Sequence, residues 1–274
     1  MSAPRSGRSV ATSAAGDLTV TTTAPGLRRA HLLAIAISLV IAASIWLVGL
    51  PESTSLFDTP LSTLTVPAAL VVAFTGITLT GALAAHRPWR VVEIVIASVL
   101  GVTGGLFLWV VAQAWNTVTA PLSFFPPASA ILAGLWLVPG VLGGLVIRRP
   151  GAAVYVELVA AVVEALLGNS WGFATVWYGL IEGLGAEFVL ALLLYRAFGL
   201  PAALLTGAGA GVAVGLLDSF VYYPEFSASY ITAYVVLAVI SGAVIAGAGC
   251  WALTRALDRA GALAPLGARG TVRI

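Results

Sequence analysis

The sequence predicts an all-α fold, a polytopic bundle of about eight transmembrane helices. Hydrophobic residues make up 60% of the 274 positions and charged residues only 9%, whereas a soluble domain carries about 25% charged residues. A helix crosses the hydrocarbon core with about 20 apolar residues, and apolar runs of about that length follow one another along the chain. They lie at about 31–50, 63–85, 91–112, 128–147, 152–168, 173–195, 200–222 and 230–254.

The loop charges support this number of helices. Basic residues occur at every second joint between the apolar runs, and the joints between them carry none. Cytoplasmic loops carry an excess of basic residues, so the alternation predicts a multi-pass protein of the cell membrane with both termini in the cytoplasm. The basic joints hold Arg28 and Arg29, Arg87 and Arg90, Arg148 and Arg149, Arg196, and Arg255 and Arg259.

The chain divides into four parts by composition. Residues 1–26 are rich in Ser, Thr, Ala and Gly without periodicity, which predicts a disordered tail. Residues 27–86 are predicted to form an extension of two membrane helices, and residues 87–260 a core of six. Residues 261–274 are expected to be a cytoplasmic tail.

Small residues recur at four-residue spacing in the first core helix, at Ala97, Gly101 and Gly105. Such a stripe lets two helix backbones approach closely in lipid. Two interpretations remain open: the stripe packs against another helix of this chain, or it docks on a partner membrane protein.

Five acidic residues fall inside the predicted helices, at Glu157, Glu164, Glu182, Glu187 and Asp218. A charge at the bilayer centre costs about 2.5 to 3.5 kcal/mol on insertion scales, so each acid requires a reason to be there. Glu157 and Glu187 are interpreted as hydrogen-bonding groups between helices. The other three acids lie in the outer half of the membrane in the predicted topology.

Polar and aromatic residues gather at the same outer end, with spacings that place them on single helix faces. An acid in line with Trp and Tyr suits a pocket for a flat, cationic or hydrogen-bonding ligand, which stacks on the rings and pairs with the carboxylate. Trp115, Tyr223 and Tyr230 are instead typical of an aromatic belt at the membrane surface. The pocket candidates are Trp109, Gln113 and Asn116; Trp171, Tyr178 and Glu182; Asp218 and Tyr222; and, nearby, Glu164 and Asn169.

Several classes of function find no support in the sequence. It contains no GxxxxGK[ST] phosphate-binding loop, no HExxH and only one cysteine, so neither an enzyme nor a bound metal or cofactor is expected. If ATP drives this protein, a separate subunit must hydrolyse it.

The strings PGAAVYVELVAAVVEALLGNSWG and GLGAEFVLAL resemble the YkoE group, and DSFVYYPEFS and WRVVEIVIASVLGV support the match. This group comprises substrate-binding S-components of energy-coupling factor (ECF) transporters, associated with thiamine and its hydroxymethylpyrimidine precursor. The resemblance covers about 87–260. It implies a six-helix core that binds its ligand outside the cell and docks on a transmembrane coupling (T) subunit, while ATPase subunits power release.

The resemblance also implies roles for individual residues. The family's binding motifs coincide with seven of the pocket candidates: Glu164, Asn169, Trp171, Tyr178, Glu182, Asp218 and Tyr222. The stripe Ala97, Gly101 and Gly105 falls where the family contacts the coupling subunit. Two features depart from the family: the extra helices in residues 1–86, and Glu182, where the family often has Gln.

A second class of function stays open. A proton-coupled secondary transporter of a small cationic or aromatic metabolite could use Glu187 and Glu157 as proton relay groups. Uptake driven by a pH gradient alone would distinguish it from an S-component, which binds its ligand but does not transport it without partners.

Overall fold

The computed structural model describes residues 88–267 without a break, together with 55–56, 59–60 and scattered positions between 72 and 85. The predicted tail (residues 1–26) and the predicted helix at 31–50 lie outside the described residues, and the helix at 63–85 is described only in part. The described part is helical except for two short antiparallel strands, β1 (Ser55–Leu56) and β2 (Thr59–Pro60).

Six helical stretches form the described core, as the apolar runs between 91 and 254 predict. Five of them, all except α5, are long and apolar enough to cross a membrane, which makes the chain a multi-pass membrane protein. The elements are α3 (Val91–Thr119) with the 3-10 turn η2 (Ala120–Leu122), the 3-10 helix η3 (Pro126–Leu135) with α4 (Val138–Ile147), α5 (Ala152–Leu167), α6 (Ala174–Leu192), α7 (Leu200–Val221), and α8 (Ala228–Ser241) with the π-helix η4 (Gly242–Ala248) and α9 (Gly249–Arg259).

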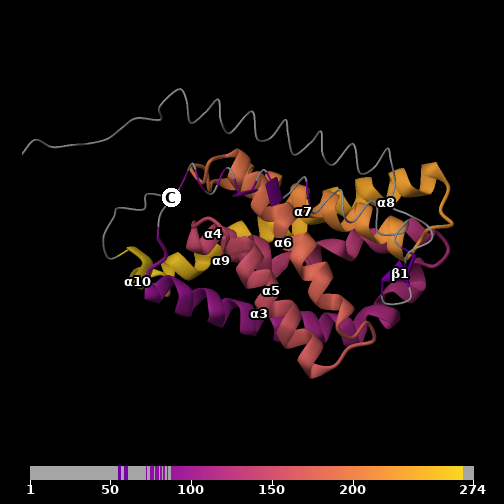
Figure 1. The fold of residues 1–274 in the computed structure, drawn as a ribbon, viewed down its shortest axis with the longest axis horizontal. Helices are drawn as coiled ribbons and strands as arrows, with labels where there is room; N and C mark the ends of the chain where they lie inside the picture. The colour runs from indigo at the N-terminus through magenta and orange to yellow at the C-terminus, as the bar shows by residue number, and fades with distance from the viewer. Residues whose placement is uncertain are drawn as a thin grey trace, which may run out of the picture.

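The short helix α5 lies at the centre of the bundle, where it packs against α3, α4 and α6. Beyond α6, the helices α7 and α8 continue the bundle, and α8 also packs on η3. In Figure 1, α3 runs along one edge of the molecule and the last short helix, α10 (Ala264–Gly267), lies near the start of α3. The central position of α5 gives its polar side chains neighbours on several sides.

The small-residue stripe of α3 faces α5. Ala97 is fully buried, and a Cβ added to Gly101 would lie 2.6 Å from Cγ1 of Val159. A Cβ added to Gly105 would lie 2.6 Å from the carbonyl oxygen of Ala160. The stripe is therefore a helix–helix contact within the chain. The expectation that it docks on a partner is wrong for this structure, because α5 already covers it.

The helices η3 and η4, which both depart from α-helical geometry, meet at Ser241. Its hydroxyl oxygen accepts a hydrogen bond from the backbone N–H of Gly134 at 2.9 Å, and the hydroxyl donates to the carbonyl of Ile131. These bonds satisfy backbone groups that irregular helices would otherwise leave unpaired inside a membrane. A single serine thus joins the two irregular segments.

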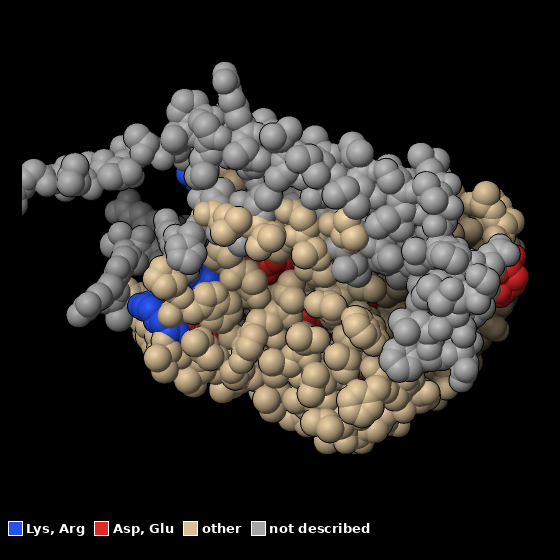
Figure 2. All heavy atoms as spheres, in the orientation of Figure 1, with Lys and Arg blue, Asp and Glu red and all other residues tan. Residues whose placement is uncertain are grey.

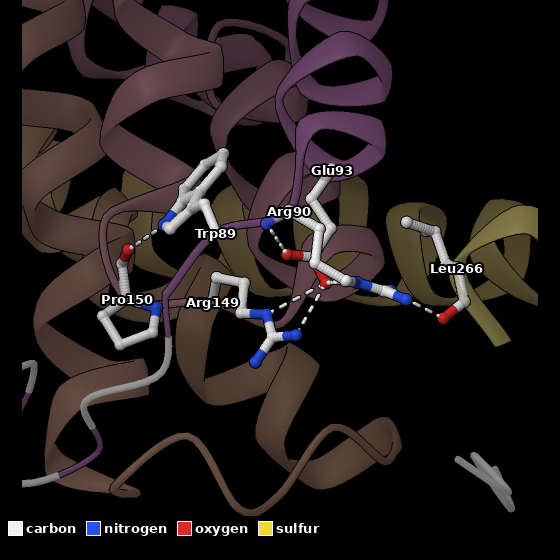
Figure 3. A network of polar contacts seen from close by, with 6 residues as sticks. All are labelled: Trp89, Arg90, Glu93, Arg149, Pro150 and Leu266. Carbon is white, nitrogen blue, oxygen red and sulfur yellow. Dashed lines mark hydrogen bonds and ion pairs between the residues drawn. The ribbon is translucent and has the colours of Figure 1, made fainter. Parts of the chain in front are cut away.

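A polar network closes the end of the bundle where α3 begins (Figure 3). Glu93 accepts hydrogen bonds from Nε of Arg90 at 3.0 Å and from Nη2 of Arg149 at 2.7 Å. Nη2 of Arg90 also donates to the carbonyl of Leu266 at 2.9 Å. The described part of the predicted C-terminal tail, 261–267, is therefore bonded to the helical core.

The basic joints of the core lie at this same end, where Figure 2 shows arginine side chains. The guanidinium of Arg148 lies 5.1 Å from the ring centre of Phe198, in the joint between α6 and α7. The guanidinium of Arg255 lies 4.5 Å from the ring of Trp251 in α9. The alternation of loop charge therefore corresponds to one end of the folded core, and the cytoplasmic placement of that end remains a prediction.

We expect Gly101→Ala to destabilise the protein, because the new Cβ would overlap Val159 on α5. Overpacking of this kind costs about 1 to 3 kcal/mol, so the melting temperature of the purified protein in detergent should fall. Gly249→Ala is the matched control, because nothing lies within 4 Å of the added Cβ and alanine favours a helix by about 1 kcal/mol. If both variants melt like the wild type, α3 and α5 do not pack as described.

Candidate functional site

A cavity of about 100 Å³ lies between the helices, lined by residues of α3, α5, α6, α7 and α8 and by Trp136 between η3 and α4. Its walls are acidic and aromatic, and among the described residues that line it there is no Arg or His. The acidic residues are Glu157, Glu164, Glu182 and Asp218. The aromatic residues are Trp115, Trp136, Trp171, Tyr178, Tyr222, Tyr223 and Tyr234.

Helical spacing explains how α5 contributes to the cavity. Glu157, Ala161 and Glu164 follow one another at i, i+4 and i+7, which places them on one face of the helix. Ala161 lies against Gly179 of α6, where an added Cβ would be 2.5 Å from the alanine Cβ. This close approach of two small residues brings the face of α6 to the same cavity. That face carries Thr175, Gly179 and Glu182.

Asn169 shapes the loop that carries Trp171. Its side-chain amide donates to Oε1 of Glu164 at 2.6 Å and to the hydroxyl of Thr175 at 2.9 Å. Its carbonyl accepts from the backbone N–H groups of Trp171 at 2.9 Å and Gly172 at 2.6 Å. The second carboxylate oxygen of Glu164, Oε2, is buried and has no hydrogen-bond partner among the described residues.

Glu157 lies deeper in the bundle and is only 1% exposed. Its Oε2 accepts a hydrogen bond from the backbone N–H of Gly140 in α4, as expected for a group that links helices. Its Oε1 is buried without a hydrogen-bond partner in the described part of the chain. Glu157 also lines the cavity.

Glu187 differs from Glu157 and Glu164 because hydrogen-bond donors of the protein bind both oxygens of its carboxylate. The backbone N–H groups of Gly151 and Ala153 donate to its carboxylate at 2.7 and 2.8 Å, and the hydroxyl of Tyr195 donates at 2.6 Å. It does not line the cavity. The interpretation of Glu187 as a structural hydrogen-bonding group is confirmed.

Tyrosines surround Asp218 on the other side of the cavity. The hydroxyl of Tyr234 donates to Oδ2 of Asp218 at 2.8 Å. The rings of Tyr178 and Tyr222 stack with their centres 5.4 Å apart. Burial raises the pKa of Tyr222 and of Tyr223 above the ordinary value, so both phenols stay neutral at physiological pH and can donate hydrogen bonds.

Three tryptophans form a connected wall of the cavity. The ring of Trp136 meets that of Trp171 edge to face at 5.5 Å, and meets that of Trp115 at 5.3 Å. Edge-to-face contacts of this kind hold aromatic rings in defined orientations. The wall therefore offers fixed ring surfaces on which a flat ligand can pack.

Six of the ten pocket residues predicted from the sequence line the cavity: Glu164, Trp171, Tyr178, Glu182, Asp218 and Tyr222. Asn169 supports the site through its hydrogen bonds. The other three predictions need correction. The side chains of Trp109 and Gln113 donate to the carbonyl of Gly168 and so anchor the loop, while Asn116 is exposed on α3.

The structure adds residues that the sequence analysis placed elsewhere. Trp115 and Tyr223, assigned to an aromatic belt, line the cavity, as do Trp136 and Tyr234. Glu157 was interpreted as a hydrogen-bonding group between helices or as a proton relay, and not as a pocket residue. Its spacing of seven residues from Glu164 was a usable signal, because it places both acids on one face. No comparable spacing links Trp136 to the other cavity residues.

The charges of the cavity are not arranged as a metal site. Within 88–267 and the shorter described stretches, no group of three or more His, Cys, Asp or Glu residues could hold a metal ion. The cavity instead combines carboxylate acceptors with aromatic surfaces. That combination suits a flat organic ligand that carries hydrogen-bond donors or positive charge.

Comparison with known proteins gives consistent matches. Residues 92–213 match a family described as the permease component of an ABC-type cobalt transport system. The chain is 36% identical over 162 residues to YkoE of Bacillus subtilis (strain 168), described as an HMP/thiamine permease protein; the match covers 59% of this chain and 80% of that protein. The fold is similar to the crystal structure of an S-component of an ECF transporter, with a TM-score of 0.61, 36% identity, and coverage of 64% of this chain and 89% of that one.

Asn169→Leu should loosen the loop that carries Trp171, because it removes the acceptor for two backbone N–H groups. Each such bond contributes about 0.5 to 1.5 kcal/mol, so hydrogen exchange at Trp171 and Gly172 should become at least about tenfold faster. Ser170→Ala, at an exposed position in the same loop, should leave exchange unchanged. Equal exchange in both variants would show that Asn169 does not organise the loop.

Proposed function

Because the chain belongs to the YkoE family of ECF-transporter S-components, we propose that it is the substrate-binding membrane subunit of a vitamin importer. Its ligand is thiamine or the hydroxymethylpyrimidine precursor of thiamine, captured from outside the cell. The observation that carries the proposal is the cavity, whose lining combines aromatic side chains with Glu157 and Glu164; each glutamate has one buried carboxylate oxygen without a hydrogen-bond partner among the described residues.

The chemistry of these ligands suits the cavity. Both contain a flat aminopyrimidine ring, whose amino group donates hydrogen bonds, and thiamine adds a thiazolium ring with a permanent positive charge. Aromatic side chains such as Trp136 and Trp171 provide stacking surfaces and attract cations. Carboxylates accept strong hydrogen bonds from an amino group and pair with the positive charge. The aromatic walls favour such an organic cation over a bare metal ion.

The position of the cavity supports uptake from outside. The loop that carries Trp171 and the joint that carries Tyr223 contain no basic residue, whereas the opposite end of the core holds the arginines. Since basic loops face the cytoplasm, the cavity lies towards the exterior. Both termini are then cytoplasmic, as the loop charges predict.

The remaining steps of transport require partners. The sequence contains no phosphate-binding loop, so ATP hydrolysis is assigned to separate ATPase subunits. These subunits and a transmembrane coupling subunit act on this chain to release the ligand to the cytoplasm. The proposal assigns the chain ligand capture and no enzymatic step. It also assigns no bound cofactor.

Glu164→Gln and Trp171→Ala should each weaken ligand binding at least tenfold, about 1.4 kcal/mol, because each removes a group that faces the cavity. Binding can be measured by tryptophan fluorescence of the detergent-purified chain, titrated separately with thiamine and with hydroxymethylpyrimidine. Trp177→Ala is the matched control, since Trp177 is 66% exposed and does not line the cavity. Unchanged binding in both cavity variants would reject this site.

The purified chain alone should not transport either ligand. Liposomes that contain only this chain should show no uptake when a pH gradient is imposed, because coupling requires the partner subunits. Proton-coupled uptake would instead favour a secondary transporter. The hydrogen bonds that satisfy Glu187 argue against its use as a relay group.

A further inference from the structure

Glu157 is held by glycines on two neighbouring helices. A Cβ on Gly140 of α4 would lie 2.6 Å from its Oε2, and a Cβ on Gly183 of α6 would lie 3.1 Å from its Cβ. With no side chains at these positions, both helices pack directly against the glutamate. The hydrogen bond from Gly140 then fixes one carboxylate oxygen and leaves Oε1 without a partner among the described residues.

Glu164 repeats this arrangement towards the outer end of α5. One of its oxygens accepts from Asn169, and the other is buried and has no partner in the described part of the protein. Seven residues separate the two glutamates, which is roughly 10 Å along the helix axis at about 1.5 Å per residue. Only Ala161 lines the cavity between them on this face, so the wall between the two carboxylates carries no large side chain.

We propose that Glu157 and Glu164 form a two-point site, in which one carboxylate binds each end of an elongated ligand. Because an unpaired buried acceptor is costly, each free oxygen rewards a donor or positive charge placed opposite it. A ligand long enough to reach both carboxylates makes two such favourable interactions, whereas a short ligand makes only one. The cavity then selects ligands by length as well as by charge.

This inference rests on the proposed function and refines it. Thiamine has two rings joined by a methylene bridge and can extend along the wall of α5. Hydroxymethylpyrimidine has one ring and reaches only one of the two carboxylates. The site therefore favours thiamine over its precursor, and the two glutamates contribute differently to the binding of the two compounds.

The test compares the two ligands in Glu157→Gln and Glu164→Gln by tryptophan fluorescence titration of the full chain. We expect both variants to weaken thiamine binding at least tenfold. One variant should weaken the binding of hydroxymethylpyrimidine to a similar degree. The ratio of the two dissociation constants then stays within about twofold of the wild-type ratio. The other variant should leave the binding of hydroxymethylpyrimidine nearly unchanged, and should therefore change the ratio of the two dissociation constants at least fivefold.

Other outcomes overturn the inference. If both variants weaken both ligands equally, or if neither weakens thiamine, the cavity has no second anchor. A wild-type chain that binds neither compound would instead reject the proposed function itself. Glu187→Gln is the matched control, because it changes a buried glutamate that does not line the cavity, and it should not change the ratio.

A second variant covers the case in which Glu157→Gln fails to fold. Glu157→Asp keeps the charge but shortens the side chain by one methylene group, which withdraws the carboxylate from the cavity. Size-exclusion chromatography in detergent establishes that each variant is folded before titration. Thiamine binding equal to that of the wild type in Glu157→Asp would also count against an anchor at this position.

Discussion

Each carboxyl group inside this apolar bundle must find hydrogen-bond donors, because burial without them is costly. Glu187 receives backbone N–H groups and a tyrosine hydroxyl, and Glu93 receives two arginines. Glu157 and Glu164 each receive donors on one oxygen only, as far as the described residues show. In the proposed function, a ligand in the cavity supplies hydrogen-bond donors to these two oxygens.

Close helix packing makes this arrangement possible. Glycines at Gly101 and Gly105 of α3 and at Gly140 of α4 let the central helix α5 lie directly against its neighbours. In lipid such contacts replace the hydrophobic drive that holds soluble cores together. The same packing determines where the glutamates of α5 point, so the stability of the bundle and the geometry of the cavity depend on the same small residues.

Most of the core could be predicted from the sequence, because membrane helices are recognised by their length, their hydropathy and the charge of the loops between them. Glu164, Glu182 and Asp218 could be identified because acidic residues are rare inside apolar helices, and all three line the cavity. Trp109, Gln113 and Asn116 were predicted to lie in the pocket, but none of the three lines the cavity. Their spacing defines one face of α3, but it does not reveal that this face supports the loop at Gly168.

The sequence by itself therefore determined the class of protein, the order of the core helices and the presence of costly acids within them, since these follow from composition and local periodicity. Only the tertiary structure decided that the stripe at Ala97 packs on α5, that Glu157 faces the cavity, and that Trp136 belongs to its wall. Periodicity specifies which residues share a helix face. Which neighbour that face meets depends on how all the helices pack together, and no single segment contains that information.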